Sequence, residues 1–298
     1  MSPPDFLVIG HVVQDLTPAA GAQTGARPGG QGWRLGGTAS YAALLAARLG
    51  LKTAALTAAA PNLPLEQAFP GVQLVRVPSD RSTQFRNVYS PQGRVQYVPQ
   101  RAATIRPDSL PDDWRDAAIV LLGPVAGEVD DALADCFPRS LIGVSAQGWL
   151  RRIGADGRVH PVPAADWQAE RLLRRDRSVF VSDEDLPAAE ARPVLDGWSR
   201  RVDVVAYTRG DRGADVCHGG SWRHIDAFPA VAVDPTGAGD VFATAFLVLY
   251  RESGDPWQAT RFAAAAAALI TESLGTESVP DRPAIEARLL AHPDIVPR

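Results

Sequence analysis

Short apolar runs recur along this chain and mark where buried strands are expected. Four to eight consecutive apolar residues, closed by glycine or a polar turn, are typical of central strands covered on both faces. Such runs occupy residues 6–10, 52–59, 117–124, 141–145, 178–181 and 202–208. Helical spacing of apolar residues follows in 36–50, 237–250, 257–270 and 281–291, with a shorter helix expected around 130–136. Strands that alternate with helices predict an α/β fold with a mostly parallel central sheet flanked by helices.

A second pattern, alternation of apolar and polar residues, sets one part of the chain apart. It runs through residues 82–89 and 94–98, on either side of Ser-Pro-Gln-Gly. Two alternating strands around a Pro-Gly turn predict a β-hairpin. Such a hairpin has no natural place in a sheet built from βα units, so we expect it outside the main sheet.

The composition narrows the class of protein. A chain of 298 residues is long enough for one large domain or two smaller ones, and we expect a single domain over residues 1–298. Hydrophobic residues make up 46% and charged residues 21%, which is ordinary for a globular protein. The net charge of -4 gives no sign of the basic face that nucleic-acid binding needs. The single lysine, Lys52, lacks the glycine frame of a P-loop, so a nucleotide would be held without that lysine.

Cysteine content and hydropathy bear on the compartment. Two cysteines, Cys136 and Cys217, are too few for a disulfide scaffold or a zinc site, and free thiols fit a reducing cytosol. No apolar run is long enough to cross a bilayer, and the N-terminal residues do not resemble a signal peptide. We therefore expect a cytoplasmic protein with no membrane partner.

The stretch from Asp234 to Phe242 carries the strongest chemical signal. It reads Asp-Pro-Thr-Gly-Ala-Gly-Asp-Val-Phe and predicts a turn followed by a helix that begins near Gly237. The first N–H groups of a helix lack internal partners and the helix dipole favours negative charge there, which suits a phosphate. Asp240, in the same turn, can act as a base toward a hydroxyl while the amides hold the phosphoryl group. The alternative, an acid that only stabilises the helix N-terminus, stays open.

This string resembles the C-terminal signature of the PfkB (ribokinase-like) carbohydrate kinases almost letter for letter. The resemblance implies a ribokinase-like α/β fold with a small β-lid, formed approximately by residues 12–35 and 80–103. A lid would exclude water from the acceptor, although an exposed hairpin without a gating role remains the alternative. The resemblance further implies that Asp240 is the catalytic base. It assigns the cofactor-binding anion hole and its flank to Thr236, Gly237, Ala238 and Gly239.

Further segments resemble the substrate side of the family. Asp15 follows the first strand, where open α/β sheets bind ligands, and the resemblance implies that it bonds substrate hydroxyls; a solvated loop residue is the alternative. Gly36 and Gly37 would let the backbone touch a substrate, or would simply let a helix pack closely. Tyr41 stands where many members have an asparagine that reaches the sugar, which puts ribose in doubt. The string Gln-Gly-Trp-Leu-Arg, ending at Arg151, looks like the inositol-kinase-like branch; Arg151 faces substrate or phosphate, or is a surface arginine.

A glycine-rich segment after residues 202–208 resembles the nucleotide side of the family. Its sequence matches the family's Thr-x-Gly-x-x-Gly, which lines the nucleotide. The resemblance thus implies cofactor contacts at Thr208, Gly210 and Gly213. Arg209 and Arg212 can offset phosphate charge in place of a P-loop lysine. A glycine hairpin between two strands is the alternative.

Magnesium has a weaker signal. The family's Asn-x-x-Glu element, tied to magnesium and phosphate, falls here on Asp183 and Leu186. Asp183, Glu184 or Asp185 can still hold a hydrated magnesium, which needs only one or two carboxylates. The same acids can equally sit at a helix N-terminus for the helix's sake. The family also leaves room for a monovalent cation.

The sequence therefore predicts a kinase that uses ATP and Mg²⁺ to phosphorylate a hydroxyl of a small polyhydroxylated molecule, a sugar or a cyclitol. A homodimer formed through the lid is a further expectation. Two alternatives stay open. One is a nucleoside kinase of the same fold, or one with another phosphate donor. The other is a catalytically impaired ligand-binding protein on this scaffold, which the departures at Tyr41 and Leu186 keep in play.

Overall fold

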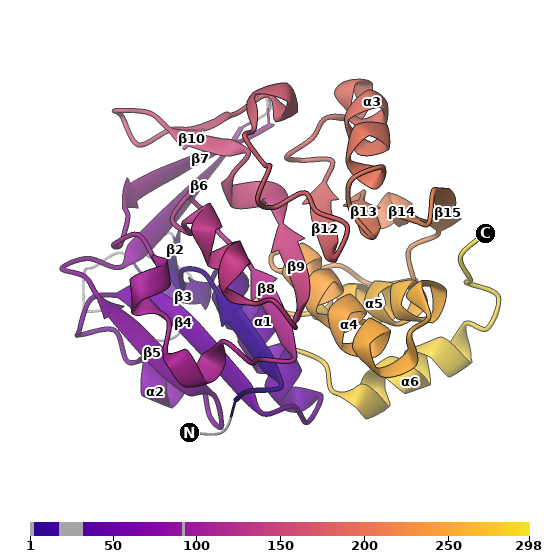
Figure 1. Ribbon diagram of the computed structural model, residues 1–298, viewed down its shortest axis with the longest axis horizontal. Coiled ribbons are helices and arrows are strands. Elements are labelled where there is room, and N and C mark those ends of the chain that lie inside the picture. The colour runs from indigo at the N-terminus through magenta and orange to yellow at the C-terminus, as the bar shows by residue number, and fades with distance from the viewer. Residues whose placement is uncertain (1–2, 18–31, 91–92) are drawn as a thin grey trace.

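The computed structural model describes residues 3–17, 32–90 and 93–298. Its main sheet has nine strands in the order β15-β14-β13-β12-β9-β8-β1-β4-β5 (Figure 1). In chain order these are β1 (Phe6–Ile9), β4 (Thr53–Ala59), β5 (Gln73–Pro78), β8 (Ile119–Leu122), β9 (Leu141–Ser145), β12 (Arg177–Ser182), β13 (Val204–Thr208), β14 (Ala214–His218) and β15 (Ser221–Ile225). All neighbours pair in parallel except β13–β14 and β14–β15, which are antiparallel. The predicted α/β fold is confirmed.

Each face of this sheet has its own apolar core, because successive strand residues point to opposite sides. Phe6 and Val8 of β1 belong to one core, and Leu7 and Ile9 belong to the other. The first core is covered by α1 (Thr38–Arg48), α2 (Leu65–Ala68), α4 (Ala238–Ser253), α5 (Pro256–Thr271) and α6 (Arg282–Ala291). The second is covered by α3 (Ala188–Ser199) and by short 3₁₀ segments. One of those segments, Asp131–Cys136, is a 3₁₀ helix where the sequence predicted a short α-helix.

A second, four-stranded sheet has the order β3-β2-β6-β7. β2 (Val13–Thr17) pairs antiparallel with β3 (Gly32–Gly36) and parallel with β6 (Thr83–Ser90), and β6 pairs antiparallel with β7 (Gly93–Gln100). Both strands of the predicted hairpin are therefore present, and they lie at the upper left of Figure 1. We call these four strands the lid sheet. Residues 18–31 of the predicted lid and residues 91–92 of its turn lie outside the described residues, and one domain with a gating lid stays a prediction.

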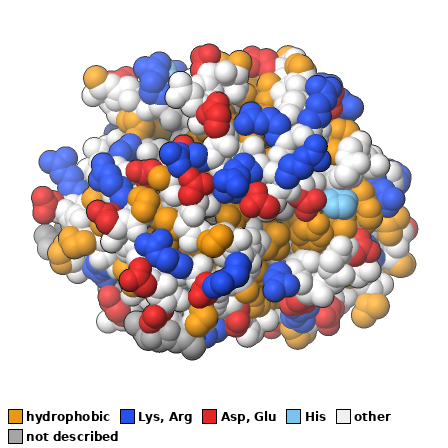
Figure 2. Space-filling model, viewed as in Figure 1, with side chains coloured by type: hydrophobic (Ala, Val, Ile, Leu, Met, Phe, Trp, Pro, Cys, Tyr) orange, Lys and Arg blue, Asp and Glu red, His pale blue; other side chains and the backbone are white. Residues whose placement is uncertain are grey.

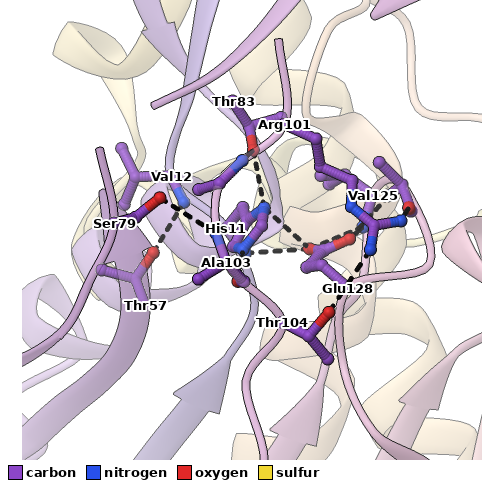
Figure 3. A network of polar contacts seen from close by, with 12 residues as sticks. His11, Val12, Thr57, Ser79, Thr83, Arg101, Ala103, Thr104, Val125 and Glu128 are labelled. Carbon is purple, nitrogen blue, oxygen red and sulfur yellow. Dashed lines mark hydrogen bonds and ion pairs between the residues drawn. The ribbon is translucent and has the colours of Figure 1, made fainter. Parts of the chain in front are cut away.

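A buried polar network joins the lid sheet to the main sheet (Figure 3). The side chain of Glu128 is fully buried and accepts backbone N–H groups at 2.7–3.0 Å from His11, Val125 and Ala126. His11 lies between β1 and β2, and its ring contacts Thr83 Oγ1 at 2.7 Å and Ala103 O at 2.9 Å. Burial lowers the pKa of His11, so the ring is neutral. The segments that connect the two sheets are therefore held by hydrogen bonds to the carboxylate of Glu128 and the imidazole of His11.

A small hairpin, β10 (Arg151–Ile153) and β11 (Val159–Pro161), connects the site region to the lid sheet. Its loop reaches β7, where Val98 N donates to Gly157 O at 2.8 Å. On the surface, Figure 2 shows basic and acidic side chains interspersed across the viewed face. Within the described part of the chain, no helix combines the length and apolar character needed to cross a membrane.

Candidate active site

The loop before α4 leaves backbone donors at the helix N-terminus. Gly237 is left-handed, with φ 83°, and Val241 N donates to its carbonyl at 2.9 Å. Among the described residues, no acceptor takes the N–H groups of Gly237, Gly239 or Asp240. Gly239 is exposed, and a side chain there would meet nothing within 4 Å. Three amide donors therefore remain available at an open helix end, which is the arrangement that binds an anion.

Ala238 of the predicted anion hole and the flanking Thr236 use their amides within the loop instead. Ala238 N donates to Pro235 O at 3.2 Å, and Thr236 N donates to Asp234 Oδ1 at 3.0 Å. These two bonds shape the turn. The N–H groups of Gly237, Gly239 and Asp240 are then the donors that the turn and the start of α4 present.

Asp240 lies in the first turn of α4 and is partly buried. Its Oδ1 accepts a hydrogen bond of 2.7 Å from Thr38 Oγ1. Desolvation raises the pKa of Asp240 to about 6, while Thr38 and Arg151 act to lower it and Asp185 to raise it. A carboxyl with a pKa near neutrality is poised to take and return a proton, which an ordinary surface aspartate is not.

Arg151 and Asp185 form a buried ion pair close to Asp240. Arg151 Nη2 and Nε lie 2.8 and 3.0 Å from Asp185 Oδ1, and the two side chains are 9% and 5% exposed. Ser182 Oγ donates to Asp185 Oδ2 at 2.9 Å, and Gln147 Nε2 lies 3.3 Å from the same oxygen. Arg151 is therefore no surface arginine, and the string that ends at it brings Gln147 to the same carboxylate.

The predicted substrate residues Asp15, Gly36 and Gly37 lie together where β2 and β3 meet α1. An ideal Cβ on Gly36 would fall 1.9 Å from Asp15 Oδ2, so only glycine leaves room for that carboxylate. Gly37 has φ 85°, and a Cβ there would come within 2.6 Å of His11 O. Both glycines thus have packing reasons, and Gly36 also sets where Asp15 lies.

Tyr41 connects this group to the α4 loop. Its side chain is 1% exposed, and its ring lies against Gly237. Burial and the nearby carboxylates of Asp15, Asp234 and Asp240 raise the pKa of Tyr41, so the phenol is neutral. The substrate-side and phosphate-side residues predicted from distant parts of the sequence therefore surround one tyrosine.

The predicted nucleotide residues lie at the end of β13 and in the turn that follows it. Thr208 O accepts Asp183 N at 3.0 Å, and Gly210 has φ 57° with open space around it. Gly213 has φ 79°, and a Cβ there would lie 2.0 Å from Ile225 O, so close approach of β15 explains this glycine. Arg209 is held by Asp215 at 3.1 Å and by His224, which places it within the protein's own ion pairs.

The described residues do not fit a protein-built magnesium cage. They contain no group of three His, Cys, Asp or Glu side chains that could hold a metal ion. Asp183, the predicted ligand, is ion-paired with Arg212, and Asp185 is ion-paired with Arg151, so both carboxylates are already neutralised. Leu186, at the second position of the predicted magnesium element, is buried in the core. The residues that contact each other are Ser182 and Asp185, each one position before the predicted pair Asp183 and Leu186.

Residues 180–282 match the pfkB family of carbohydrate kinases, and this segment contains all of α4 with Asp240. This match spans about a third of the chain. An inositol 3-kinase from Zea mays is 33% identical over 177 residues, which span 56% of this chain but only 45% of that relative. A cytidine kinase from Thermococcus kodakarensis is 27% identical over 267 residues, 83% of this chain and 88% of the relative.

Solved structures confirm the ribokinase-like fold. A pyrophosphate-dependent kinase in the ribokinase family, in complex with sulfate, has a TM-score of 0.77 and 22% identity, covering 95% of this chain and 99% of that one. Arabidopsis thaliana ribokinase complexed with ribose and ATP has a TM-score of 0.73 and 22% identity, covering 97% and 99%. The family match over residues 180–282, which contain the Asp234 to Phe242 string, confirms the PfkB resemblance.

Proposed function

We propose that this PfkB protein transfers the γ-phosphoryl group of ATP to a hydroxyl of a small sugar or cyclitol. The observation that carries the proposal is the carboxylate of Asp240, whose pKa is raised to about 6. It lies in the same helical turn as amide donors that have no acceptor among the described residues. An anion hole and a base at this spacing serve phosphoryl transfer to an alcohol.

In the proposed reaction, Asp240 takes the proton of the acceptor hydroxyl while the oxygen of that hydroxyl forms a bond to the γ-phosphorus. The bond between that phosphorus and the β–γ bridging oxygen breaks, and ADP leaves with the electron pair. The N–H groups of Gly237 and Gly239 hold the migrating phosphoryl oxygens in place. General-base assistance of this kind contributes about 10²–10⁴ in rate, and positioning supplies much of the rest.

The acceptor is proposed to lie between Asp15 and Asp240, with the backbone of Gly36–Gly37 beside it. Arg151, which is held near Asp240 by its ion pair with Asp185, is proposed to face the substrate or the transferring phosphate from there. The relatives that support a sugar or cyclitol include inositol 3-kinases from Zea mays and Oryza sativa and a ribokinase from Bacillus subtilis. Tyr41 has no side-chain amide, and its ring is buried against the α4 loop, so it does not replace the asparagine that reaches the sugar in many ribokinase-like kinases. This favours a cyclitol over ribose.

The donor is proposed to be ATP, bound along Thr208, Gly210 and Gly213 toward the α4 loop. Magnesium is proposed to arrive with the nucleotide, since Mg²⁺ keeps several waters and is readily held by substrate phosphates. A monovalent cation, a homodimer through the lid sheet and a cytoplasmic location belong to the same proposal. Dependence of turnover on K⁺, sedimentation velocity and cell fractionation test these three in turn.

A nucleoside acceptor is the second candidate, favoured by the 88% coverage of the cytidine kinase from Thermococcus kodakarensis. An inactive binding protein on this scaffold is the third. Release of ADP should be measured over a panel of inositols, pentoses and nucleosides with ATP as donor, and release of orthophosphate over the same panel with pyrophosphate as donor. Turnover of a sugar or cyclitol with ATP supports the proposal; turnover of nucleosides alone, or of nothing, contradicts it.

The role of Asp240 has its own test within that panel. Asp240→Asn should keep ligand binding, measured by calorimetry, and lose turnover by about 10²-fold or more. Phosphoryl transfer at the wild-type rate by this variant would remove Asp240 from the mechanism.

A further inference from the structure

The N-termini of α1 and α4 meet through a single side-chain hydrogen bond. Thr38, the first residue of α1, donates from Oγ1 to Asp240 Oδ1 at 2.7 Å. Thr38 is fully buried, whereas Asp240 is partly exposed. A buried hydroxyl thus reaches from the substrate-side helix to the carboxylate that serves as the proposed base.

Packing fixes the direction of this hydroxyl. An ideal Cβ on Gly123, just after β8, would lie 2.2 Å from Thr38 Cγ2, so the bare Cα of Gly123 is the seat of the threonine methyl. A β-branched side chain has few rotamers, and with its methyl seated the hydroxyl has a fixed position. The hydroxyl of Thr38 is therefore oriented by the packing of its methyl group against Gly123, and this orientation directs it toward Asp240.

The hydrogen bond from Thr38 makes the two carboxylate oxygens of Asp240 inequivalent. Asp240 Oδ1 is occupied by Thr38, while Oδ2 has no hydrogen-bond partner among the described residues. The charged and titratable groups that face Asp240 are Arg151 of β10, Asp185 after β12 and Tyr41 of α1. Of the influences that lower the pKa of Asp240 against its burial, the Thr38 hydrogen bond is the largest.

We propose that Thr38 is a positioning residue for phosphoryl transfer, holding Asp240 by Oδ1 so that Oδ2 is the oxygen that accepts the proton of the substrate hydroxyl. This inference rests on the proposed kinase function and adds to it a specific source of the base's orientation and ionisation. A hydroxyl that only joined two helices would affect stability, but it would leave the pH dependence of turnover where it was.

The test compares Thr38→Val, which removes the hydroxyl at constant shape, with Thr38→Ser, which keeps it. In Thr38→Val the acid limb of kcat against pH should move upward by roughly one pH unit, the size expected for losing one hydrogen bond to a charged carboxylate. KM for donor and acceptor should change far less than kcat. Thr38→Ser should restore the acid limb. Thr38→Ala, which relieves any crowding at Gly123, repeats the removal if the valine variant does not fold.

A matched control is Thr260→Val, because Thr260 is also fully buried and its hydroxyl donates to Pro256 O at 2.7 Å, far along the chain in α5. It should lower stability without moving the acid limb. An acid limb that stays in place in Thr38→Val, or that moves equally in Thr260→Val or Thr38→Ser, overturns the inference.

A second measurement separates this inference from the kinase function. The Asp240 carboxyl can be titrated by ¹³C NMR in the protein without ligands, with Asp240→Asn for assignment. An upward shift of its midpoint in Thr38→Val supports the control of Asp240 by Thr38, and an unchanged midpoint overturns it even in an active kinase. A shifted midpoint in a protein that turns over no acceptor overturns the kinase function instead.

Discussion

Gly237 rests on the ring of Tyr41. An ideal Cβ on Gly237 would lie 2.5 Å from both Cδ1 and Cε1 of that ring, a separation that real side chains do not tolerate. The ring is buried, so it cannot swing into solvent to make room. The left-handed turn that presents the α4 amides is therefore supported by its packing against Tyr41 of α1.

Gly237→Ala should consequently disturb both the turn and the ring beneath it. The positive φ and the contact with Tyr41 together predict a stability loss of about 1–3 kcal/mol. Displacement of one amide donor predicts a turnover loss of about 10²-fold or more. Thermal unfolding and steady-state kinetics measure the two effects. The matched stability control is Gly239→Ala, which points into open space and should unfold near the wild-type temperature; equal losses in both variants would contradict the role given to Tyr41.

Asp240 should make the folded protein less stable as the pH rises. Its pKa is raised from 3.8 to about 6 in the folded state, so the folded state binds this proton more tightly than the unfolded state does. Stability associated with this group is thus present below pH 3.8 and is lost as the pH rises through about 6. Allowing for the partial exposure of the side chain, the loss is about 1–2 kcal/mol at pH 8.

Asp240→Asn should therefore be more stable than the wild type at pH 8 by that amount, with little difference at pH 4. Urea unfolding at the two pH values measures the free energies. Asp294→Asn, an exchange at an exposed aspartate, should show no such pH-dependent gain. A variant at Asp240 that is less stable than the wild type at pH 8 would argue against a desolvated carboxylate.

The Arg151–Asp185 pair should show strong energetic coupling. Both side chains are nearly fully buried, so Arg151→Met or Asp185→Leu alone leaves a buried charge unpaired, at a predicted cost of about 3–5 kcal/mol. The double variant should lose much less than the sum. A double-mutant cycle by urea unfolding measures this, with the exposed pair Arg192–Asp196 as a control that should couple by about 0.5 kcal/mol or less. Additive losses at Arg151 and Asp185 would show that the pair is not formed in solution.

Glu128 should be essential to the junction of the two sheets. Glu128→Gln puts an amide NH₂ among three backbone donors, so at least one buried N–H loses its acceptor, at a cost of about 1–3 kcal/mol or more. Unfolding in urea and proteolysis within the lid sheet measure the effect. Glu286→Gln, at an exposed site of α6, should leave both unchanged. Wild-type behaviour of Glu128→Gln would mean that the junction depends on apolar packing alone.

Much of the fold followed from local patterns. Apolar runs such as residues 6–10 and 202–208 became central strands because burial on both faces demands consecutive apolar residues. The hairpin strands were equally clear from alternation. The small β10–β11 hairpin was not recognised, because each of its strands has only three residues. Strands that short carry no periodicity that could be distinguished from a loop.

The candidate site was predictable where one contiguous string carries it. The turn, the helix start and Asp240 all fall within nine residues, so their proximity was implied by sequence alone. Thr38 was missed, because its partner lies 202 residues away and nothing in the sequence encodes that contact. Asp185 was considered for magnesium or for a helix N-terminus, but not as the partner of Arg151. Its burial against Arg151 depends on how the hairpin after β9 folds back. Tyr41 was noted as a departure from the family pattern, but its packing against Gly237 in the turn before α4 was not predicted.

The β10–β11 hairpin has a consequence for how the molecule can respond to a substrate. Its first residue, Arg151, is bonded to Asp185 near the proposed base, and its loop is bonded to β7 through Val98 and Gly157. A displacement of β7 is therefore expected to be transmitted through the hairpin to the guanidinium of Arg151. The position of the lid sheet and the charge environment of Asp240 are thus connected through one short element.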